Sequence, residues 1–515
     1  MGGVVAAGHQ QTAAAAVEVL NQGGNAFDAA VAGVLASCVT ESVLTSLAGG
    51  GFLMAHTAGH DSVLYDFFTQ TPVNKALSHA LDFYPIHADF GDTVQEFHIG
   101  LGAVAVPGVL KGLAHVHHRL GRLPLKQVVA PAVYLARHGV VINDFLAYVY
   151  RLLQPILLAT KEASSIYAPA GELLKAGERL HMPAFATSLE RLVEGGIELF
   201  WEEISENLTK TQGGYLTKAD FDHYQVIERE PLCLDYHGTQ LLTNPPPSAG
   251  GGLIACSLAL LANCDLMTHG SPEHLLALSQ VMRFTNIARR DGYDARLQEP
   301  AVTEQFLSSD HLSQYRQELA TAIATLRSNQ SIANKLGSTT HLSVIDTEGN
   351  AASVTTSNGE GSSYVIPGTD IMANNMLGEE DLNPHGFHQW QPNQRISSMM
   401  APTMVLRDDR PYLVLGSGGS NRIRTAILQV ISNLVDFQMP LEAAVMAPRI
   451  HWENNTFHIE PGYDHAQAIL GNARPVWWQA QNMFFGGVHA VGLDDTGALY
   501  GAGDHRRQGA VAVAR

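Results

Sequence analysis

The sequence predicts a mixed α/β fold in which helices and strands share one hydrophobic core. Three observations support this prediction. Stretches with helical periodicity alternate with short β-branched runs, residues 337–361 form a distinct strand–turn–strand pattern, and no Pro-, Gly- or Ser-rich linker divides the 515 residues. Hydrophobic residues make up 46% of the chain and charged residues 16%, as in a compact globular protein.

The helices are predicted from apolar residues that recur at helical spacing. Gly23-Gly24 ends the first helix, and the longest apolar run, Ala29 to Val39, is too short to span a bilayer. The predicted helices cover residues 9–22, 26–37, 253–262, 310–336 and 424–435, with further helices within 108–160.

The strands are predicted from short β-branched and apolar runs bounded by turn residues. They cover residues 52–56, 62–67, 240–243, 403–406 and 412–415, besides the two strands within 337–361. Pro245–Gly252 follows one of them, and we interpret it as a rigid and then flexible loop.

Residues 337–361 have the clearest pattern. One face of the first strand holds Thr339, His341, Ser343 and Ile345, and the other holds Thr340, Leu342 and Val344. Gly349 can take the positive φ of the turn, and Ala351–Ser357 returns as a second β-branched run. A plain hairpin explains this centre, but neither the Gly-Ser-Thr-Thr entry nor the glycine-rich exit.

The charge of the chain excludes several classes of partner. A net charge of −18 argues against nucleic acid and against an anionic membrane surface. The four cysteines lack paired spacing, so we interpret them as small core residues and expect no disulfide framework. We expect a cytoplasmic location for the chain as given, and a periplasmic or secreted one if a leader was removed.

Familiar catalytic motifs are missing from the chain. No Gly-x-Ser-x-Gly elbow occurs, and the glycine-rich Gly416–Ser420 lacks the lysine of a phosphate loop. His115, His117 and His118 lack the HExxH spacing and an obvious carboxylate partner, so we interpret them as solvated helix histidines. We therefore expect neither a metal nor a cofactor.

Thr339 is the candidate nucleophile. A hydroxyl is a poor nucleophile unless a base lies within hydrogen-bond reach. Cleavage just before Thr339 would supply one, because an α-amino group has an unperturbed pKa of about 7.7–8.0. Gly337-Ser338 suits the strained turn that such a cleavage needs. Taken alone, the residues leave a plain buried hairpin as the alternative, with His341 as a core histidine or a rival base.

Several short motifs, in the same order along the chain, resemble the γ-glutamyltranspeptidase (glutathione hydrolase) family of N-terminal-nucleophile hydrolases. They are Gly24–Ala30, Gly49–Phe52, Val106–Gly108, Leu135–Gly139, Asn244–Ser248, Thr339–Val344, Ser397–Met399, Gly416–Gly419 and Gly501–Gly509. Each motif alone is weak, but together they cover nearly the whole chain.

The resemblance implies a four-layer αββα sandwich formed by a precursor that cuts itself between Ser338 and Thr339. Residues 1–338 would form a large subunit and residues 339–515 a small one, together making one globular domain. Thr339 would be both the cleavage and the catalytic nucleophile, and Ser357 would orient it. The backbone N–H groups of Gly419 and Ser420 would form the oxyanion hole.

The carboxylate side of the substrate pocket departs from the family. The resemblance implies an arginine that holds the γ-glutamyl α-carboxylate, but Phe68 occupies that position, and a phenyl ring cannot replace a guanidinium fork. The remaining candidate donors are Arg395 and a serine pair. That pair is Ser397 and Ser398, or has Met399 as its second member if it is aligned from Ala401-Pro402.

The amino-group side is partly kept. The resemblance implies an acidic ligand, which corresponds to Glu379 or Glu380, and a second ligand at Asn358. Met376 replaces a family glutamine.

The expected activity is cleavage of a γ-glutamyl amide such as glutathione through a Thr339 acyl-enzyme, with water or an amino acid or peptide as acceptor. One alternative is a family amidase of the cephalosporin-acylase kind, with Phe68 lining an apolar acyl pocket. Another is an uncleaved, inactive homologue that acts as a binding protein. The sequence does not choose between hydrolysis and transfer.

Overall fold

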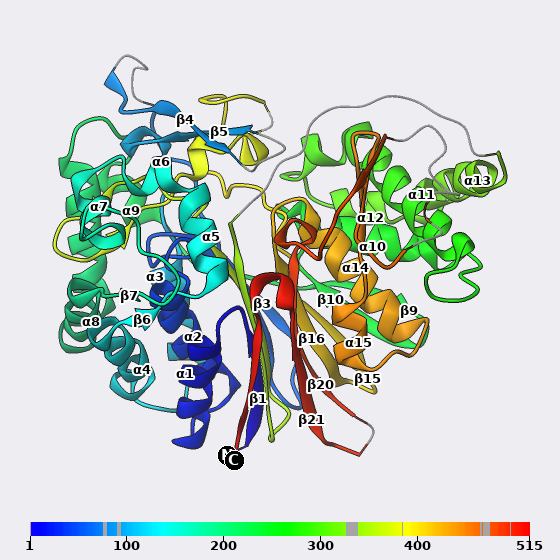
Figure 1. Cartoon of the computed structure of the whole chain (residues 1–515), viewed down its shortest axis with the longest axis horizontal. Helices are drawn as coiled ribbons and strands as arrows, with labels where there is room; N and C mark the ends of the chain where they lie inside the picture. Colours follow the sequence, from blue (N-terminus) through cyan, green and yellow to red (C-terminus); the bar gives the residue numbers. More distant parts are fainter. Residues whose placement is uncertain are drawn as a thin grey trace.

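The computed structural model of the chain describes residues 2–75, 80–89, 94–325, 338–383, 385–463, 466, 474–494 and 496–515. Two antiparallel sheets stack face to face, and helices cover the outer face of each (Figure 1). This arrangement is the αββα sandwich expected from the resemblance, and the hydrophobic cores lie between its layers.

The first sheet has seven strands, and the N-terminal and C-terminal strands lie side by side in it. Their order is β22 (Ala510–Ala514), β1 (Gly3–Ala7), β11 (Thr340–Asp346), β12 (Ala351–Ser357), β2 (Gly50–His56), β3 (Val63–Phe67) and β8 (Ile227–Arg229). The helices of the first 223 residues lie on its outer side (Figure 1). They are α1 (Gln10–Asn21), α2 (Ala26–Thr40), α3 (Val109–Leu120), α4 (Leu125–His138), α5 (Asp144–Leu152), α6 (Gln154–Leu157), α7 (Lys161–Tyr167), α8 (Pro183–Lys210) and α9 (Lys218–His223).

The second sheet has six strands. Their order is β21 (Leu499–Gly503), β20 (Gly487–Leu493), β16 (Arg410–Gly418), β15 (Thr403–Arg407), β10 (Thr239–Thr243) and β9 (Leu232–Tyr236). The helices on this side of the molecule are α10 (Ala249–Leu261), α11 (Pro272–Ala288), α12 (Val302–Phe306), α13 (Ser309–Thr325), α14 (Arg422–Val435) and α15 (Leu441–Met446). The predicted strands at 240–243, 403–406 and 412–415 all belong to this sheet.

The predicted hairpin lies at the centre of the first sheet. β11 and β12 pair from Thr340 opposite Thr356 to Ile345 opposite Ala351, and Gly349 takes φ +88° in the turn. Leu342 and Val344 pack with the core under α1 and α2, whereas Ile345 packs with the core shared with the second sheet. The alternation that the sequence predicted is thus confirmed, and it directs the side chain of His341 toward β16.

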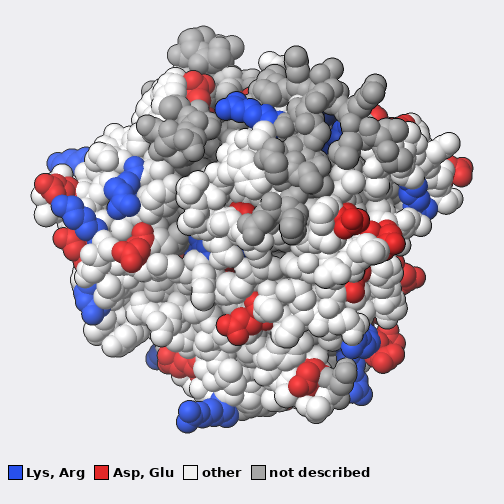
Figure 2. Space-filling view, turned by 45° about the vertical axis from the view of Figure 1, so that its right-hand side comes forward, with Lys and Arg blue, Asp and Glu red and all other residues white. Residues whose placement is uncertain are grey.

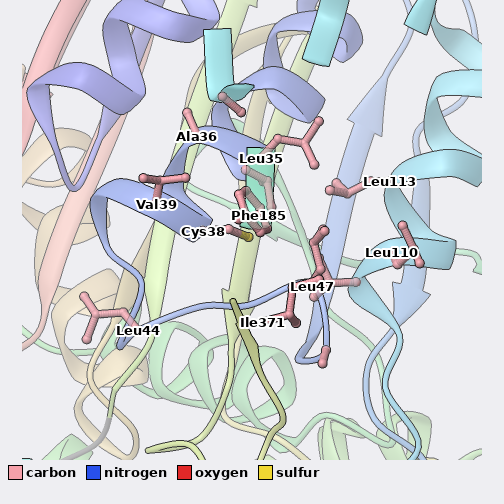
Figure 3. Close-up of a cluster of buried hydrophobic side chains, with 14 of the residues drawn as sticks. Leu35, Ala36, Cys38, Val39, Leu44, Leu47, Leu110, Leu113, Phe185 and Ile371 are labelled. Atoms are coloured by element: carbon pink, nitrogen blue, oxygen red, sulfur yellow. The ribbon is translucent and has the colours of Figure 1, made fainter. Parts of the chain in front are cut away.

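The prediction of four core cysteines is correct in part. Cys38 lies among Leu35 of α2, Phe185 of α8 and their neighbours in the apolar core (Figure 3), and Cys256 is also buried. Cys233 is exposed, which contradicts the prediction, because β9 is an edge strand whose side chains alternate between partly buried and exposed. All four cysteines are free thiols, and Cys264 is half-buried.

The prediction that the second half of Pro245–Gly252 is a flexible loop is wrong. α10 already begins at Ala249, so its three glycines are helical. A Cβ atom at Gly250 would lie 2.2 Å from the Met399 carbonyl oxygen, and one at Gly251 would lie 2.1 Å from that of Asn244. These glycines therefore allow close backbone packing and do not provide flexibility.

The predicted 310–336 helix is described only as far as Thr325, and its remainder to Gly337 lies outside the described residues. Charged side chains of both signs are scattered over the face shown in Figure 2. Among the described residues, no helix has the length and apolarity needed to cross a membrane.

Candidate active site

One pocket gathers most of the predicted site residues. It lies where β11 begins and where β12 and β16 end, and it is bordered by the loops that precede β15 and follow α11. Its walls include Phe68, Ser338, Thr339, Ser357, Glu379, Asp381, Ser397, Ser398, Met399 and Ser420. Residues more than 300 positions apart in the chain thus meet at the predicted nucleophile.

Thr339 stands immediately before β11 and is 6% exposed. Its carbonyl oxygen accepts a hydrogen bond from Arg507 Nη1 at 3.1 Å. A Cβ atom at Gly418, the last residue of β16, would lie only 2.1 Å from that same oxygen. Thr339 is therefore fixed between the two sheets by close packing as well as by hydrogen bonding.

Ser357, the last residue of β12, holds the peptide bond between Ser338 and Thr339. Its Oγ donates to the Ser338 carbonyl oxygen at 2.6 Å and accepts from the Gly359 N–H at 3.0 Å. A donor on this oxygen would stabilise the negative charge that the predicted attack of Thr339 on the Ser338 carbonyl carbon would create. Ser357 thus contacts the carbonyl on which the predicted cleavage would take place.

Glu360 binds the other side of Ser338. The Ser338 N–H donates to Glu360 Oε1 at 3.0 Å, and Ser338 Oγ donates to Glu360 Oε2. Burial raises the pKa of Glu360 to about 7, against the lowering effect of these two hydrogen bonds and of Arg507. Sequence analysis missed this residue, although it stands in the unexplained glycine-rich exit of the hairpin.

A second buried carboxylate supports the first residue of β11. Thr340 Oγ1 donates to Glu41 Oε1 at 2.7 Å, and Thr12 Oγ1 donates to Glu41 Oε2 at 3.2 Å. Burial raises the pKa of Glu41 to about 7, while Arg507 acts in the opposite direction. Burial also lowers the pKa of Arg507, to about 10. Sequence analysis missed both Glu41 and Arg507, whose partners lie far away along the chain.

The predicted oxyanion hole lies at the turn between β16 and α14. Gly419 and Ser420 both have positive φ, +123° and +49°, so the backbone turns sharply beside Thr339. Ser420 Oγ donates to Asp381 Oδ2 at 2.8 Å, which anchors the turn. Ser420, Asn421 and Ile423 line the pocket at the N-terminal end of α14, where a helix favours negative charge.

Phe68 closes the pocket where the resemblance implies an arginine. It is 1% exposed and stacks on Phe52 with ring centroids 5.3 Å apart. Arg395 does not replace the missing cation, because its guanidinium is buried against other groups. It pairs with Asp66 at 3.2 Å and donates to the carbonyls of Phe68 and Gln225 at 2.7 Å each.

The serine pair lies at the pocket. Ser397 and Ser398 both line it, and so do Met399 and Met400. The Ser398 Oγ accepts from the Met400 N–H at 3.0 Å, and the Ser398 carbonyl accepts from the N–H of Ala249 at 2.8 Å. The loop before β15 is thus held against the start of α10.

Of the predicted ligands of the substrate amino group, only Glu379 lies at the pocket. Glu379 lines the pocket, and its Oε1 is buried without a hydrogen-bond partner among the described residues. Burial raises the pKa of Glu379 well above its ordinary value, and neighbouring Glu360 and Asp381 raise it further. Glu380 is exposed, and Asn358 is turned away, its Nδ2 donating to the carbonyls of Met372 and Ala373.

His341 does not face the pocket. Its Nδ1 is 2.8 Å from Thr355 Oγ1 and its Nε2 is 2.9 Å from Ser343 Oγ, so both ring nitrogens are engaged within the sheet. Burial lowers its pKa well below 6.5. Its surroundings are those of a hydrogen-bonded core histidine.

The described part of the chain gathers no group of three or more His, Cys, Asp or Glu side chains suited to a metal ion. The three histidines of α3 have separate surroundings. His115 lies 2.9 Å from Glu228, which corrects the expectation that these histidines lack a carboxylate partner; His117 contacts the Leu123 carbonyl, and His118 is exposed. The described lining of the pocket supplies hydroxyl and carboxyl groups, among them those of Thr339, Ser357, Glu379 and Asp381.

Comparison with known proteins finds a family, curated relatives and solved structures that are similar to this chain. A family model described as gamma-glutamyltranspeptidase matches residues 12–514. The glutathione hydrolase proenzyme of Escherichia coli (strain K12) is 30% identical over 536 residues, which cover 98% of this chain and 90% of that protein. The acylase ACY 1 proenzyme of Pseudomonas sp. (strain V22) is 32% identical over 524 residues, covering 98% and 92%. The crystal structure of cephalosporin acylase from Bacillus halodurans has a TM-score of 0.85 and 25% identity, covering 99% of this chain and 95% of that one.

Proposed function

The chain belongs to the γ-glutamyltranspeptidase family of N-terminal-nucleophile hydrolases, and from this premise we propose that it is a self-processing amide hydrolase with Thr339 as its nucleophile. The single observation that supports this most strongly is the Ser338–Thr339 peptide, which lines the pocket with a hydroxyl donor on its carbonyl oxygen. The relatives described as proenzymes agree with such a cleavage.

Processing follows from these contacts. Thr339 Oγ attacks the Ser338 carbonyl carbon, Ser357 stabilises the oxyanion, and the C–N bond breaks as the nitrogen takes up a proton. The acyl group is now an ester on Oγ. Water hydrolyses this ester, which leaves a carboxyl group on Ser338 and a free α-amino group on Thr339. The products are the chains 1–338 and 339–515.

Turnover repeats the same bond changes on an external amide. The Thr339 amine accepts the proton of its own hydroxyl, and Oγ attacks the substrate carbonyl. The N–H groups of Gly419 and Ser420 receive the oxyanion. The Thr339 ammonium then gives its proton to the substrate nitrogen, and the amine of the substrate leaves. Water, or an amino acid or peptide acceptor, then attacks the acyl-enzyme ester.

The pocket supports an acylase-type specificity best. An ionised carboxylate in a closed pocket needs a cation or several donors, because desolvation costs several kcal/mol. Phe68 offers none, and the Arg395 guanidinium is already bound to Asp66 and to two carbonyls. We therefore propose an acyl group that presents an apolar surface to Phe68, and the similarity to proteins named acylase supports an acyl group other than γ-glutamyl.

Cleavage of γ-glutamyl amides such as glutathione is the second candidate. It is favoured by Glu379, an acidic group for the substrate ammonium, and by the hydroxyls of Ser397 and Ser398, which could bind a carboxylate weakly. On this candidate the apparent affinity for glutathione is expected to be weak.

Thr339→Ala tests self-processing. The variant has no hydroxyl for the acyl shift, so it should remain a single 55.4 kDa chain on denaturing electrophoresis, while the wild type gives two chains. Thr339→Ser, which keeps a hydroxyl, should still cleave. Cleavage of the alanine variant before residue 339 would show that an outside protease acts. A wild-type chain that stays intact would favour the inactive binding protein.

A panel of acyl p-nitroanilides tests the activity. We expect mature enzyme to release nitroaniline faster from an apolar acyl anilide than from the γ-glutamyl anilide. The opposite order would favour the glutathione hydrolase candidate. Adding glycylglycine as acceptor separates hydrolysis from transfer, because only transfer increases nitroaniline release and forms an acylated dipeptide.

A further inference from the structure

The pocket beside Thr339 is predominantly acidic. Its described lining contains three carboxylates, Glu379, Asp381 and Asp294, and one guanidinium, that of Arg289. Arg289 is already engaged, with its Nε 2.6 Å from Asp294 Oδ2 and its Nη1 3.2 Å from Asn421 Oδ1. An acyl group that enters this pocket therefore meets more carboxyl groups than free cations, which favours a group that carries hydrogen-bond donors or a positive charge.

A fourth carboxylate lies behind Ser338. Glu360 is 2% exposed and does not line the pocket while Ser338 is in place, because both of its oxygens accept hydrogen bonds from Ser338. Its neighbour Glu379 has an oxygen without a partner, which lies 2.1 Å from the position that a Cβ atom on Gly359 would take. The glycine on the N-terminal side of Glu360 thus leaves room for a second carboxylate beside it.

Ser338 is itself an acyl group in the processing reaction. When Thr339 Oγ attacks, the seryl residue becomes esterified to the same oxygen that later holds the substrate acyl group. The nitrogen on the carbon next to that carbonyl is the one whose N–H donates to Glu360. Glu360 is therefore placed to bind an amino group on the α-carbon of an acyl group that takes the position of Ser338.

We propose that Glu360, covered by Ser338 in the uncleaved chain, is uncovered by cleavage and then binds the α-ammonium group of the substrate. The preferred substrate class is an α-aminoacyl amide without a carboxylate on its acyl part. This inference rests on the proposed function and adds a substrate class to it. This assignment keeps Glu360 hydrogen-bonded after cleavage. The ammonium group of the substrate supplies donors in place of the Ser338 N–H and Oγ, and its charge is opposite to that of a carboxylate.

The test compares two isosteric substrates. L-Alanyl-p-nitroanilide and isobutyryl-p-nitroanilide differ only in that a methyl group replaces the ammonium. Wild-type enzyme should have a higher kcat/KM for the alanyl substrate. Glu360→Gln should lose about ten- to hundredfold in kcat/KM on that substrate and change little on the isobutyryl one, since a hydrogen bond to a charged group is worth about 1.5–3 kcal/mol.

Glu194→Gln is the matched control, because Glu194 is an exposed carboxylate on α8, outside the pocket, and should leave both rates unchanged. Equal losses on both substrates for Glu360→Gln would overturn the proposal and assign Glu360 to the Thr339 amine or to folding. Equal wild-type rates on the two substrates would overturn it as well. If neither anilide is hydrolysed and the chain stays intact, the proposed function itself fails.

A binding measurement covers the case in which Glu360→Gln does not mature. L-Alaninamide should inhibit mature wild-type enzyme at least about tenfold more strongly than isobutyramide. It should show no binding by calorimetry to the uncleaved Thr339→Ala chain, in which Ser338 still covers Glu360. Binding of L-alaninamide to the uncleaved chain with the same affinity, or equal inhibition by the two amides, would overturn the proposal.

Discussion

Ser357 and Gly359 form a donor chain that ends on the carbonyl oxygen of Ser338. Both hydrogen bonds are buried, at 2.6 Å and 3.0 Å, and together they fix the orientation of the Ser357 hydroxyl. Within the proposed mechanism, Ser357 acts on the precursor before any substrate is bound. Processing and turnover can therefore be affected separately by single substitutions.

Ser357→Ala should slow processing. Removing one donor from an oxyanion typically costs about 10²–10³ in rate, and the alanine leaves the Ser338 carbonyl without this partner. Ser357→Thr, which keeps the hydroxyl, is the control and should process at a rate closer to that of the wild type. A time course of cleavage after rapid purification, followed by mass spectrometry, measures both. Processing of Ser357→Ala at the wild-type rate would rule out this role.

Phe68→Arg should shift specificity toward γ-glutamyl amides. A guanidinium in place of the ring offers the two-pronged donor that a substrate carboxylate needs, so the ratio of γ-glutamyl to neutral acyl turnover should rise by about tenfold or more. Phe68→Met, which stays apolar, is the control for lost stacking on Phe52. A ratio that moves the other way, or tight glutathione binding that survives Arg395→Ala, would contradict the account of this pocket.

At the scale of elements, the two sheets meet around buried histidines. His341 of β11 lies against β16, and His489 is on neighbouring β20. Burial lowers the pKa of His489 to about 4; Arg507 and Arg449 lower it further, while Asp504 acts in the opposite direction. The pKa of His341 is likewise lowered, by burial and by His489. The contact between the sheets therefore requires both imidazoles to be neutral.

This predicts a loss of stability in acid. Above about pH 6.5 His489 is neutral in both states. Between pH 6.5 and about 4 the unfolded chain binds a proton that the folded chain excludes, so its stability falls by an order of 3 kcal/mol for this group. Denaturant unfolding of the uncleaved Thr339→Ala chain at several pH values measures this.

His489→Gln should make that pH dependence shallower. Glu41 and Glu360 change the stability with pH in the opposite direction, but both chains contain them. The difference in stability between variant and parent therefore isolates the contribution of His489. The pKa values of the two glutamates are raised to about 7, so the stability they contribute is lost as pH rises from about 4.5 to 7. Parallel curves for the parent and the His489→Gln chain would contradict the prediction.

Local patterns predicted the elements that depend on local periodicity. The β11–β12 hairpin, its two faces and the turn at Gly349 follow from alternation and turn chemistry within 20 residues. Thr339 could be found for the same reason, because it stands at the entry of a strand. The glycines of α10 were misread because glycine serves both flexible loops and close packing, and only the tertiary contacts distinguish the two.

The supporting residues of the site could not be found in this way. Glu41 contacts Thr340 across 299 residues and Arg507 contacts Thr339 across 168, and nothing near either of them in the chain indicates that contact. Arg395 shows the opposite case. It is only two residues before Ser397, which lines the pocket, but its guanidinium is bound to Asp66 and to backbone carbonyls. Which way a side chain turns depends on neighbours brought together by folding.

At the scale of the whole molecule, the two predicted subunits are interleaved. In the first sheet, β1 of residues 1–338 lies between β22 and β11, which both belong to residues 339–515. β12 pairs with β2 on its other side, and in the second sheet β15 pairs with β10. Within the described ranges, four strand ladders therefore cross from one predicted subunit to the other.

Cleavage before Thr339 should consequently leave one folded particle. The two chains cannot separate without breaking these ladders and exposing the core between the sheets, so they should elute together in size-exclusion chromatography without denaturant. They should separate only at the denaturant concentration at which circular dichroism reports unfolding. The uncleaved Thr339→Ala chain is the control and should elute at the same volume. Recovery of either chain alone, folded and in native buffer, would contradict the interleaved arrangement, because neither could complete the first sheet by itself.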